Sequence, residues 1–321
     1  MHRPHRGSMQ FWPRKRAKRV YARVHSWKET SEQKLLGFLG YKAGMTHILM
    51  KDTNPNSHTK NMQLATAVTI VECPPMKVYG VRFYQDTVYG TKLVGEIRTK
   101  KVDKEFARKT KAGKKEGSKP EHFDDVRIIV YTQPKRTGIG KKKPELMEMA
   151  VGGKNAHDKA AFAESLLDKE IKINDVFKAG QLLDIHSVTK GKGFQGTVKR
   201  FGVGIRQHKA EKTKRGIGTL GSWTPKRVQY TVAQPGKMGN HLRTEFNKLS
   251  LKIGDKPEEV NPKGGFLHYG IVKNDYIIIK GSIPGSTKRA ITLTEPMRIP
   301  KNHKPILIEI SYVSTESKQG A

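Results

Sequence analysis

The chain has 321 residues, of which 62 are Lys or Arg and 29 are Asp or Glu, so its formal net charge is +33 at pH 7. The mutual repulsion of so many positive charges brings no benefit to an enzyme that acts on small neutral metabolites. A partner with dense negative charge would neutralise the positive charge. The charge therefore argues against a small-molecule substrate and indicates nucleic acid or an anionic membrane surface as the partner.

The apolar segments are too short for a membrane protein. No apolar run approaches the ~18 residues that a membrane helix needs, and the Arg-rich N-terminus has no apolar stretch of signal-peptide type. The single cysteine, Cys73, cannot form an internal disulfide and excludes a CxxC zinc site or redox pair. We interpret Cys73 as a small buried residue at a strand end. The sequence therefore predicts an intracellular protein without a membrane partner.

Residues 1–34 form a basic arm with ten Lys or Arg and two acids. Aromatic residues lie irregularly among these cations, and two prolines interrupt any helix. A segment of this kind is unstructured alone and lies along RNA, where its rings stack on bases and its cations pair with phosphates. A solvated tail or a nuclear-import run at residues 13–19 is the alternative. The candidate RNA-binding residues of the arm are Arg14, Lys15, Arg16, Lys18 and Arg19.

From Leu35 onward the chain consists of short apolar stretches separated by Gly, Asp, Asn and Pro, which is typical of β-strands. Helices are predicted at only two places: a charged one at 102–111, and one at 157–168 where Ala and Leu recur at helical spacing. The predicted strands lie in 35–39, 48–49, 64–71, 126–132, 181–188, 266–271, 276–280, 290–294 and 305–310.

The order of these elements indicates a mainly β fold. Because the helices cluster between residues 95 and 170 while strands flank them on both sides, a small α/β domain inserted in a β-barrel fits better than a doubly wound sheet. The predicted parts are an N-terminal extension at 1–34, a discontinuous barrel domain at 35–94 and 171–321, an inserted α/β domain at 95–170, and a long basic loop at 200–245 that extends from the barrel.

Residues 188–250 are the most unusual stretch, with fourteen Lys or Arg, two acids, ten glycines and no periodic apolar face. A loop longer than ~15 residues without structure of its own is rare in compact domains and is usually functional or disordered. This one cannot bury apolar surface against itself, so we expect an external partner to order it. A plain disordered linker is the alternative.

Two sets of residues in this stretch are candidates for RNA contact. Glycines would let the backbone approach closely packed phosphates and bases; these are Gly191, Gly193, Gly196, Gly236 and Gly239. The candidate RNA-binding side chains are Lys190, Lys192, Phe194, Lys199, Arg200, Arg206, His208, Lys209, Lys212, Lys214, Arg215, Trp223, Lys226, Arg227, Lys237, His241 and Arg243.

Trp223 lies near the middle of the loop, between Gly221 and Pro225, which predicts a turn and hence a tip. Burial in a core is the usual fate of a tryptophan. Here no neighbouring apolar periodicity offers such a core, so we expect the ring to stack on RNA.

The motifs that would indicate catalysis are either absent from the sequence or lack the secondary structure that they need. Residues 191–196 match GxGxxG, but a dinucleotide site needs a helix directly after the glycines, and the β-branched residues and further glycines that follow predict none. The HRD and DFG strings of a kinase do not occur. His208 and His241 have no carboxylate companions, and metal binding needs converging ligands. We therefore predict no catalytic residue, no metal and no cofactor.

Three separated motifs resemble those of one family. Residues 40–46 read GYKAGMT and are similar to the early GxKxGMT element of the ribosomal protein L-three family. Residues 281–285 read GSIPG, followed by Lys288 and Arg289, and are similar to its late element. The resemblance spans nearly the whole chain and favours the archaeal and eukaryotic branch. The family's central signature is matched by Phe177, Asp184, Ser187, Thr189, Gly191, Lys192, Gly193, Gly196 and Arg200.

The resemblance implies a structural constituent of the large ribosomal subunit with a translation-protein-type β-barrel. It implies an inserted α/β domain, an N-terminal extension, and a central loop that penetrates ribosomal RNA toward the peptidyl transferase centre. The implied partners are large-subunit ribosomal RNA and neighbouring large-subunit proteins, in the cytoplasm and without homo-oligomerisation. One departure is Lys214, which stands where eukaryotic relatives carry a methylated histidine, so that modification is not carried over.

Two other classes of protein remain as alternatives. An architectural DNA-binding protein would more often show a reading helix with basic residues or an apolar wedge, and neither is evident in the sequence. An RNA-modifying enzyme would need a cofactor site, and GxGxxG lacks the context for one.

Overall fold

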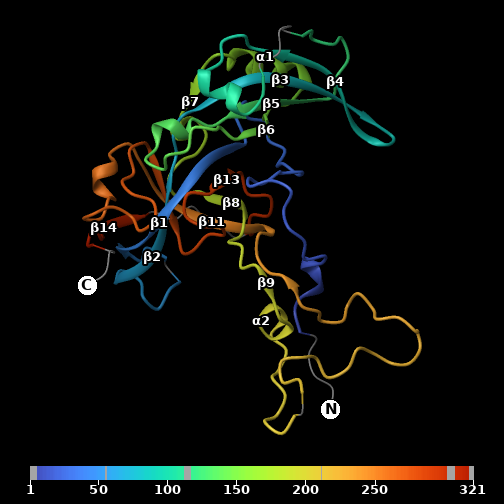
Figure 1. Cartoon of the computed structure of the whole chain (residues 1–321). Helices are drawn as coiled ribbons and strands as arrows, with labels where there is room; N and C mark the ends of the chain where they lie inside the picture. Colours follow the sequence, from blue (N-terminus) through green and yellow to red (C-terminus); the bar gives the residue numbers. More distant parts are fainter. Residues whose placement is uncertain (1–5, 55, 112–116, 211, 302–307, 318–321) are drawn as a thin grey trace. The chain divides into compact units, whose positions relative to one another are not determined.

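The computed structural model describes residues 6–54, 56–111, 117–210, 212–301 and 308–317 (Figure 1). The chain forms two compact units. The extension unit comprises Met1–Arg19 and Val188–Leu242, and the core unit comprises Val20–Ser187 and Arg243–Ala321. Most of the regular structure is β-strand, which confirms the mainly β class.

A seven-stranded sheet has the strand order β13-β8-β11-β12-β2-β1-β14, and β13 also pairs with β1. This additional pairing closes six of the strands into a ring, and β14 extends the sheet beyond β1. The strands are β1 (Gly37–Lys51), β2 (Gln63–Glu72), β8 (Leu182–Val188), β11 (Leu242–Gly254), β12 (Tyr276–Lys280), β13 (Ala290–Thr294) and β14 (Glu309–Val313).

A second, five-stranded sheet has the order β4-β3-β5-β6, with β7 paired to β3. Its strands are β3 (Met76–Thr87), β4 (Gly90–Arg98), β5 (Asp125–Tyr131), β6 (Leu146–Ala150) and β7 (Glu170–Ile171), and α1 (Ala156–Ser165) packs on β5 and β3. One apolar cluster includes Phe38 of β1, Val81 of β3 and Ile128 of β5, so both sheets share a core. The sheet starts at Met76, inside the segment predicted as barrel, and the division into barrel and inserted domain stays a prediction.

The remaining elements are short. They are the 3-10 turns η1 (Met9–Phe11), η2 (Lys104–Arg108), η3 (Pro134–Arg136), η4 (Ile173–Asp175) and η5 (Pro257–Glu259), the two-residue strands β9 (Phe194–Gln195) and β10 (Gly236–Lys237), and the helix α2 (Thr197–Phe201). Figure 1 shows that most of the extension unit, apart from these elements, is irregular chain.

The predicted strands at 64–71, 126–132, 181–188, 276–280 and 290–294 and the helix at 157–168 are confirmed. The helix predicted at 102–111 is only the 3-10 turn η2, held by the buried ring of Phe106 against Tyr79 and Tyr131. The strand predicted at 266–271 is wrong. This segment is a tight turn in which Phe266 bridges to Gly270. Of the strand predicted at 305–310, residues up to 307 lie outside the described part, and β14 begins at Glu309.

β1 is one continuous strand of 15 residues, where the sequence suggests separate short stretches. The glycines inside it serve close packing rather than turns. A Cβ on Gly40 would lie 2.5 Å from Cγ1 of Val71, and one on Gly44 would lie 2.6 Å from the ring of Phe266. Glycine in a strand interior often marks such a close approach.

The segment from Val20 to residue 34 differs from the expectation of an arm without a core. Ala22 and Val24 are buried, and Tyr21 and Trp27 pack against the main apolar cluster. Lys34 pairs with Glu295 at 3.0 Å. An irregular segment that runs along an apolar core can therefore bury its apolar residues whatever their spacing. Each of these residues packs against a different part of the core.

Cys73 lies between β2 and β3 and is fully buried as a free thiol, as expected. Burial raises the pKa of its thiol well above the ordinary value, and the charges of Glu72 and Asp275 act in the same direction. The group is therefore an inert thiol, because the thiolate is the reactive form.

Candidate nucleic-acid interface

The extension unit is almost free of negative charge. Its two segments contain nineteen Lys or Arg and one acid, Glu211, which lies outside the described residues. The cations therefore have no carboxylate partner among the described residues of this unit. Positive potential adds up over such a surface and attracts a polyanion.

Most of the predicted RNA-binding side chains of this unit are exposed. They are Lys15, Arg16, Lys18, Arg19, Lys190, Lys192, Phe194, Lys199, His208, Lys209, Lys212, Lys214, Arg215, Trp223, Lys226, Arg227 and Lys237. Contact with RNA by these residues remains a prediction.

Two strongly basic segments, far apart in sequence, lie side by side in the extension unit. The Ala17 amide donates to the Asn240 carbonyl oxygen at 2.8 Å, and Nδ1 of His241 lies 2.8 Å from the Lys15 carbonyl oxygen. The side chain of His241 is buried. The arm and the basic loop, predicted as separate RNA-binding segments, are therefore parts of one surface, and His241 has a partner inside it.

Arg200 ties three backbone segments together. Its Nε donates to the Lys237 carbonyl oxygen at 3.0 Å, Nη1 to that of Gln234 at 2.8 Å, and Nη2 to that of Arg14 at 3.3 Å. Arg14 in turn donates from Nη1 to the Arg200 carbonyl oxygen at 2.6 Å. Burial lowers the pKa of both guanidinium groups, and for Arg200 the nearby Arg14 charge adds to this. The planar fork of arginine, with its several donors, suits this role.

We call this set of hydrogen bonds made by Arg14 and Arg200 the clasp. An aromatic cluster lies beside it. The guanidinium of Arg14 lies 4.2 Å from the ring centre of the buried Phe201, and the Trp12 ring lies 5.5 Å from it. Trp12 also meets the edge of Tyr230 at 5.9 Å. Cation–π contacts and aromatic pairs thus take the place of an aliphatic core in this unit. Trp12, expected among the aromatics that stack on RNA, is half-buried within the cluster.

Trp223 is 84% exposed, so it is not a core residue. It follows Gly221, which has a φ of +126°, and Ser222 Oγ donates to the Thr224 carbonyl oxygen at 2.6 Å. Lys226 and Arg227 line the same concave surface as the ring. An exposed ring beside two cations is the arrangement found in single-strand nucleic-acid binding sites.

The five glycines predicted for backbone approach fall into two groups. A Cβ on Gly239 would lie 2.0 Å from the Lys190 carbonyl oxygen, and one on Gly236 would lie 2.9 Å from the Arg200 guanidinium, so internal packing already requires these two. A Cβ on Gly193 or Gly196 would meet open space, and one on Gly191 would only touch Asn240 at 3.7 Å. These last three leave room for an external group near the backbone.

A short helix does follow the GxGxxG match, so the expectation of no helix there is wrong. α2 starts directly after Gly196 and ends at Phe201, and its C-cap Gly202 has a left-handed φ of 71°. The buried ring of Phe201 and the clasp of Arg200 hold this turn despite its β-branched residues. The helix has only five residues, and the glycines flank the two-residue strand β9 rather than the end of a long strand. The context of a dinucleotide site is therefore still missing.

Two further predicted residues are half-buried. Arg206 donates from Nη1 to Thr213 Oγ1 at 3.3 Å and from Nη2 to the Ile217 carbonyl oxygen, which folds the loop locally. Arg243 lies on β11 at the start of its core-unit portion.

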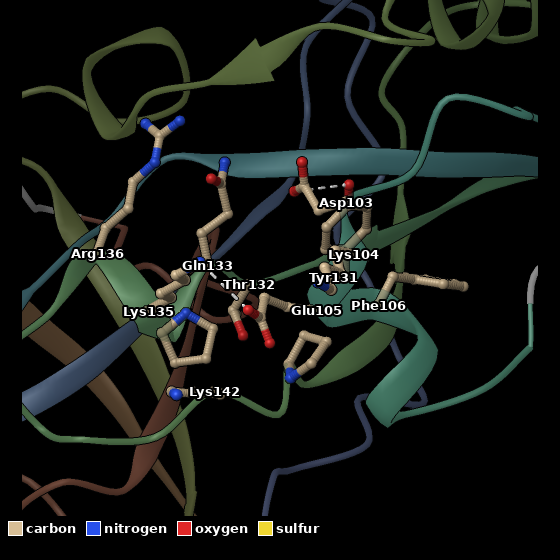
Figure 2. Close-up of a pocket in the computed structure, with 12 residues that line it drawn as sticks. Asp103, Lys104, Glu105, Phe106, Tyr131, Thr132, Gln133, Lys135, Arg136 and Lys142 are labelled. Carbon is tan, nitrogen blue, oxygen red and sulfur yellow. Dashed lines mark hydrogen bonds and ion pairs between the residues drawn. The ribbon is translucent and has the colours of Figure 1, made fainter.

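A hollow of about 240 Å³ in the core unit is lined by residues of η2, η3 and the end of β5, which Figure 2 shows. Several of the charged groups around it form ion pairs or hydrogen bonds. Tyr131 donates to Asp103 at 3.1 Å, Lys135 pairs with Glu105 at 3.3 Å, and Arg136 pairs with Glu170 at 2.5 Å. Its polar side chains thus stabilise the fold rather than form a reactive set.

The buried carboxylate of Glu72 is a structural acceptor. It accepts from the amides of Lys273 and Asn274 at 2.8 and 3.0 Å, from Asn274 Nδ2 at 2.7 Å, and from the Tyr269 hydroxyl. The described residues contain no group of three or more His, Cys, Asp or Glu placed to hold a metal ion. Across the same residues, no helix is long and apolar enough to span a membrane.

A chain that combines an acid-poor cationic unit with a mainly β core has the organisation of a structural RNA-binding protein. The family model described as Ribosomal protein L3 matches residues 1–124 and 120–320. Large ribosomal subunit protein uL3 of Methanobrevibacter smithii is 45% identical over 333 residues, which cover 99% of this chain and 98% of the relative. The uL3 proteins of Methanococcus aeolicus and Methanocaldococcus jannaschii are 46% and 45% identical, with 99% and 100% of this chain and 98% of each relative covered.

The chain therefore belongs to the ribosomal protein L3 family, in its archaeal form. It is a structural constituent of the large ribosomal subunit in the cytoplasm, associated with ribosomal RNA and other ribosomal proteins, and it is not an enzyme. The resemblance seen in the three sequence motifs is thus confirmed.

Proposed function

We propose that the extension unit binds large-subunit ribosomal RNA, organises RNA near the peptidyl transferase centre and supports early assembly of the subunit. The observation that carries this proposal is the ratio of nineteen cations to one acid in a unit whose two segments are clasped into one surface. Phosphate contacts position a protein on nucleic acid and provide most of the affinity.

The affinity and the local effect on RNA come from different residues. Lysines and arginines along both segments neutralise phosphates and release counterions, so binding must weaken steeply as salt rises. The exposed ring of Trp223 adds stacking worth ~1–3 kcal/mol, which is much less than the phosphate contacts combined. The Trp223 loop therefore orders RNA locally, while the cations hold the protein in place.

Salt-dependent binding of the full chain to large-subunit ribosomal RNA fragments tests the proposal. We expect a log–log slope of about −0.7 to −0.9 per neutralised phosphate, with at least ~6 phosphates engaged. A shallow slope, equivalent to one or two contacts, would mean that the charge is solvated surface.

A matched pair of variants makes this test specific to the extension unit. Lys209→Gln with Lys226→Gln removes two exposed cations of that unit, and Lys60→Gln with Lys263→Gln removes two exposed cations of the core unit. The first pair should reduce the slope by about 2, since each lost phosphate contact removes roughly 1. The second pair should leave it unchanged, and equal effects of both pairs would contradict the proposal.

A further inference from the structure

The hairpin of β3 and β4 extends beyond its sheet. β3 pairs with β5 only as far as Tyr84, opposite Asp125, whereas its pairing with β4 continues to Thr87, opposite Gly90. The outer part of the hairpin is therefore a two-stranded ribbon (Figure 1). Its tip consists of Val88 and Tyr89, which are 99% and 101% exposed.

The turn itself does not explain these two residues. Hairpin turns ordinarily use Asn, Asp or Gly, and here Gly90, with a φ of +108°, supplies the positive φ. On β4, Leu93 and Val94 are also exposed, at 42% and 43%. Exposed apolar side chains gathered on one hairpin indicate an interaction surface.

β4 is the edge strand of the sheet, and only part of its edge is covered. At Gly95 the chain at Ser118 and Pro120 lies against it, since a Cβ there would be 2.7 Å from Pro120 Cδ. All residues from 90 to 94 are exposed. A free edge next to an apolar tip can accept an extended segment of another chain.

Beside the ribbon lies a hollow of about 450 Å³ with a mixed charged lining, in which the acids Glu29, Asp86, Asp124 and Asp125 are matched in number by Lys28, Arg127, Lys154 and Lys159. Asp125 is compensated by Lys159 and Arg127, at 3.3 and 3.2 Å. Asp124 accepts from the Asp86 amide at 2.8 Å. Among the described residues, no Lys or Arg forms an ion pair with the carboxylates of Asp86 or Asp124. Two carboxylates of the lining, both on exposed residues, can therefore accept an external cation.

Charge distinguishes this surface from the RNA-binding one. The ribbon from 84 to 95 has one cation, Lys92, and one acid, Asp86, in a chain with a large cation excess. Trp223, another strongly exposed aromatic, lies beside Lys226 and Arg227. A phosphate backbone would meet Asp86 and Asp124 here, and repulsion disfavours it. A protein segment with Lys or Arg would instead find both counter-charge and an apolar contact.

We propose that the β3–β4 hairpin, with the unpaired carboxylates of Asp86 and Asp124 beside it, docks a basic segment of a neighbouring large-subunit protein. Apolar side chains of that segment pack on Val88 and Tyr89, and its Lys or Arg enters beside Asp86 and Asp124. The proposal depends on membership of the large subunit and is independent of RNA binding by the extension unit.

Photocrosslinking in assembled large subunits tests it. Tyr89 is replaced by p-benzoyl-phenylalanine, which a fully exposed position accommodates, and the adduct is classified by nuclease and protease treatment and by mass spectrometry. We expect an adduct with one ribosomal protein, through a basic segment of it. An adduct with RNA, or none, would overturn the proposal. The same probe at Trp223 should give an RNA adduct, so its failure would count against the proposed function alone.

A charge reversal tests the two unpaired carboxylates of the hollow within the same subunits. Asp86→Lys with Asp124→Lys should reduce the yield of the Tyr89 protein adduct about tenfold. The control is Glu121→Lys with Glu258→Lys, two exposed acids outside the hollow, which should leave the yield unchanged. Equal yields from the two pairs would show that the hollow takes no part. If the Asp pair does not assemble, the Tyr89 adduct of the otherwise unchanged chain still decides the proposal.

Discussion

Arg14 and Arg200 each donate a guanidinium hydrogen bond to the other's backbone carbonyl oxygen, at 2.6 and 3.3 Å, although 186 residues separate them in the sequence. Two positively charged side chains thus hold the segment of Arg14 against that of Arg200. Each guanidinium satisfies a carbonyl dipole and contacts the ring of Phe201, so attraction to neutral groups offsets the mutual repulsion. The extension unit can therefore have a defined fold with almost no acids.

The first prediction concerns this clasp. Arg200→Lys keeps the charge but loses the fork that reaches three carbonyl groups, so the two segments should separate more often. Hydrogen exchange at the Ala17 amide, which donates to Asn240, should rise about tenfold, since a charged hydrogen bond is worth roughly 1.5 kcal/mol or more. Lys199→Arg is the matched control on an exposed neighbour. Unchanged exchange in Arg200→Lys would show that the clasp does not stabilise the unit.

The second prediction concerns order along the predicted arm. Limited trypsin digestion should cleave the outer loop at 212–229 rapidly in the free protein and slowly in the ribosomal particle, because RNA orders this loop. Residues 14–19 should be cleaved more slowly in the free protein, since Arg14 and Ala17 are hydrogen-bonded to Arg200 and Asn240. Residues 20–34 should resist in both states, since Ala22, Val24 and Trp27 pack in the core unit. Equal resistance of all three segments in the free protein would contradict ordering by a partner.

The third prediction separates glycines of the core from glycines of the RNA-binding surface. Gly40→Ala places a Cβ 2.5 Å from Val71 Cγ1 and should lower the free energy of unfolding by roughly 1–3 kcal/mol. Gly196→Ala meets open space and should leave stability unchanged while weakening binding to ribosomal RNA fragments. Urea unfolding and filter binding measure the two effects. If Gly196→Ala binds RNA normally, the backbone at this position does not approach RNA closely.

The fourth prediction concerns pH. His186 lies between Thr294 and Thr244, at 3.1 and 2.9 Å, and burial lowers its pKa from the ordinary 6.5, with Asp184 partly opposing the shift. Protonation is therefore more favourable in the unfolded chain. The stability due to neutral His186 is fully present above pH 6.5 and is lost as pH falls below that value, until the folded protein is also protonated.

His186→Gln removes this titration and keeps polar atoms near both threonines. The difference in unfolding free energy between the wild type and this variant should shrink from pH 7.5 to pH 5.5. A difference that grows toward low pH would mean that the folded protein stabilises the charged imidazole.

The sequence predicts the charged surface better than the contacts inside it. Exposed cations such as Lys209 and Lys226 follow from composition, because a lysine without a partner lies in solvent. Arg14, Arg200 and His241 instead contact backbone carbonyl groups that are distant in sequence. The local sequence pattern gives no information about which carbonyl groups these are. Gly40 and Gly44 mislead for the same reason, because glycine in a strand signals a break unless the neighbour that needs the space is known.

The strands that the sequence does not predict have physical reasons as well. β4 is mostly exposed, so no apolar alternation marks it, and β3 carries Lys77 and Arg82 within its apolar run. Most of β11 lies within the basic stretch at 188–250 that suggests a loop. Pairing with partners distant in sequence creates these strands, and propensity alone is weak for them.

The last prediction concerns Trp223, whose ring is 84% exposed in a loop held by turns and by no apolar core. Since stacking is worth ~1–3 kcal/mol, much less than the combined phosphate contacts, Trp223→Ala should leave incorporation into the large subunit nearly intact. It should shift the binding of aminoacyl-tRNA at the peptidyl transferase centre by about tenfold, because ~1.4 kcal/mol is one decade in affinity. Tyr89→Ala, at a fully exposed aromatic on the neutral ribbon of β3 and β4, is the control and should leave tRNA binding unchanged. Chemical probing of the centre and tRNA binding on purified variant ribosomes measure the effect. Unchanged probing and affinity would contradict the placement of this loop near the centre, and loss of incorporation would show instead that Trp223 is needed for folding or assembly.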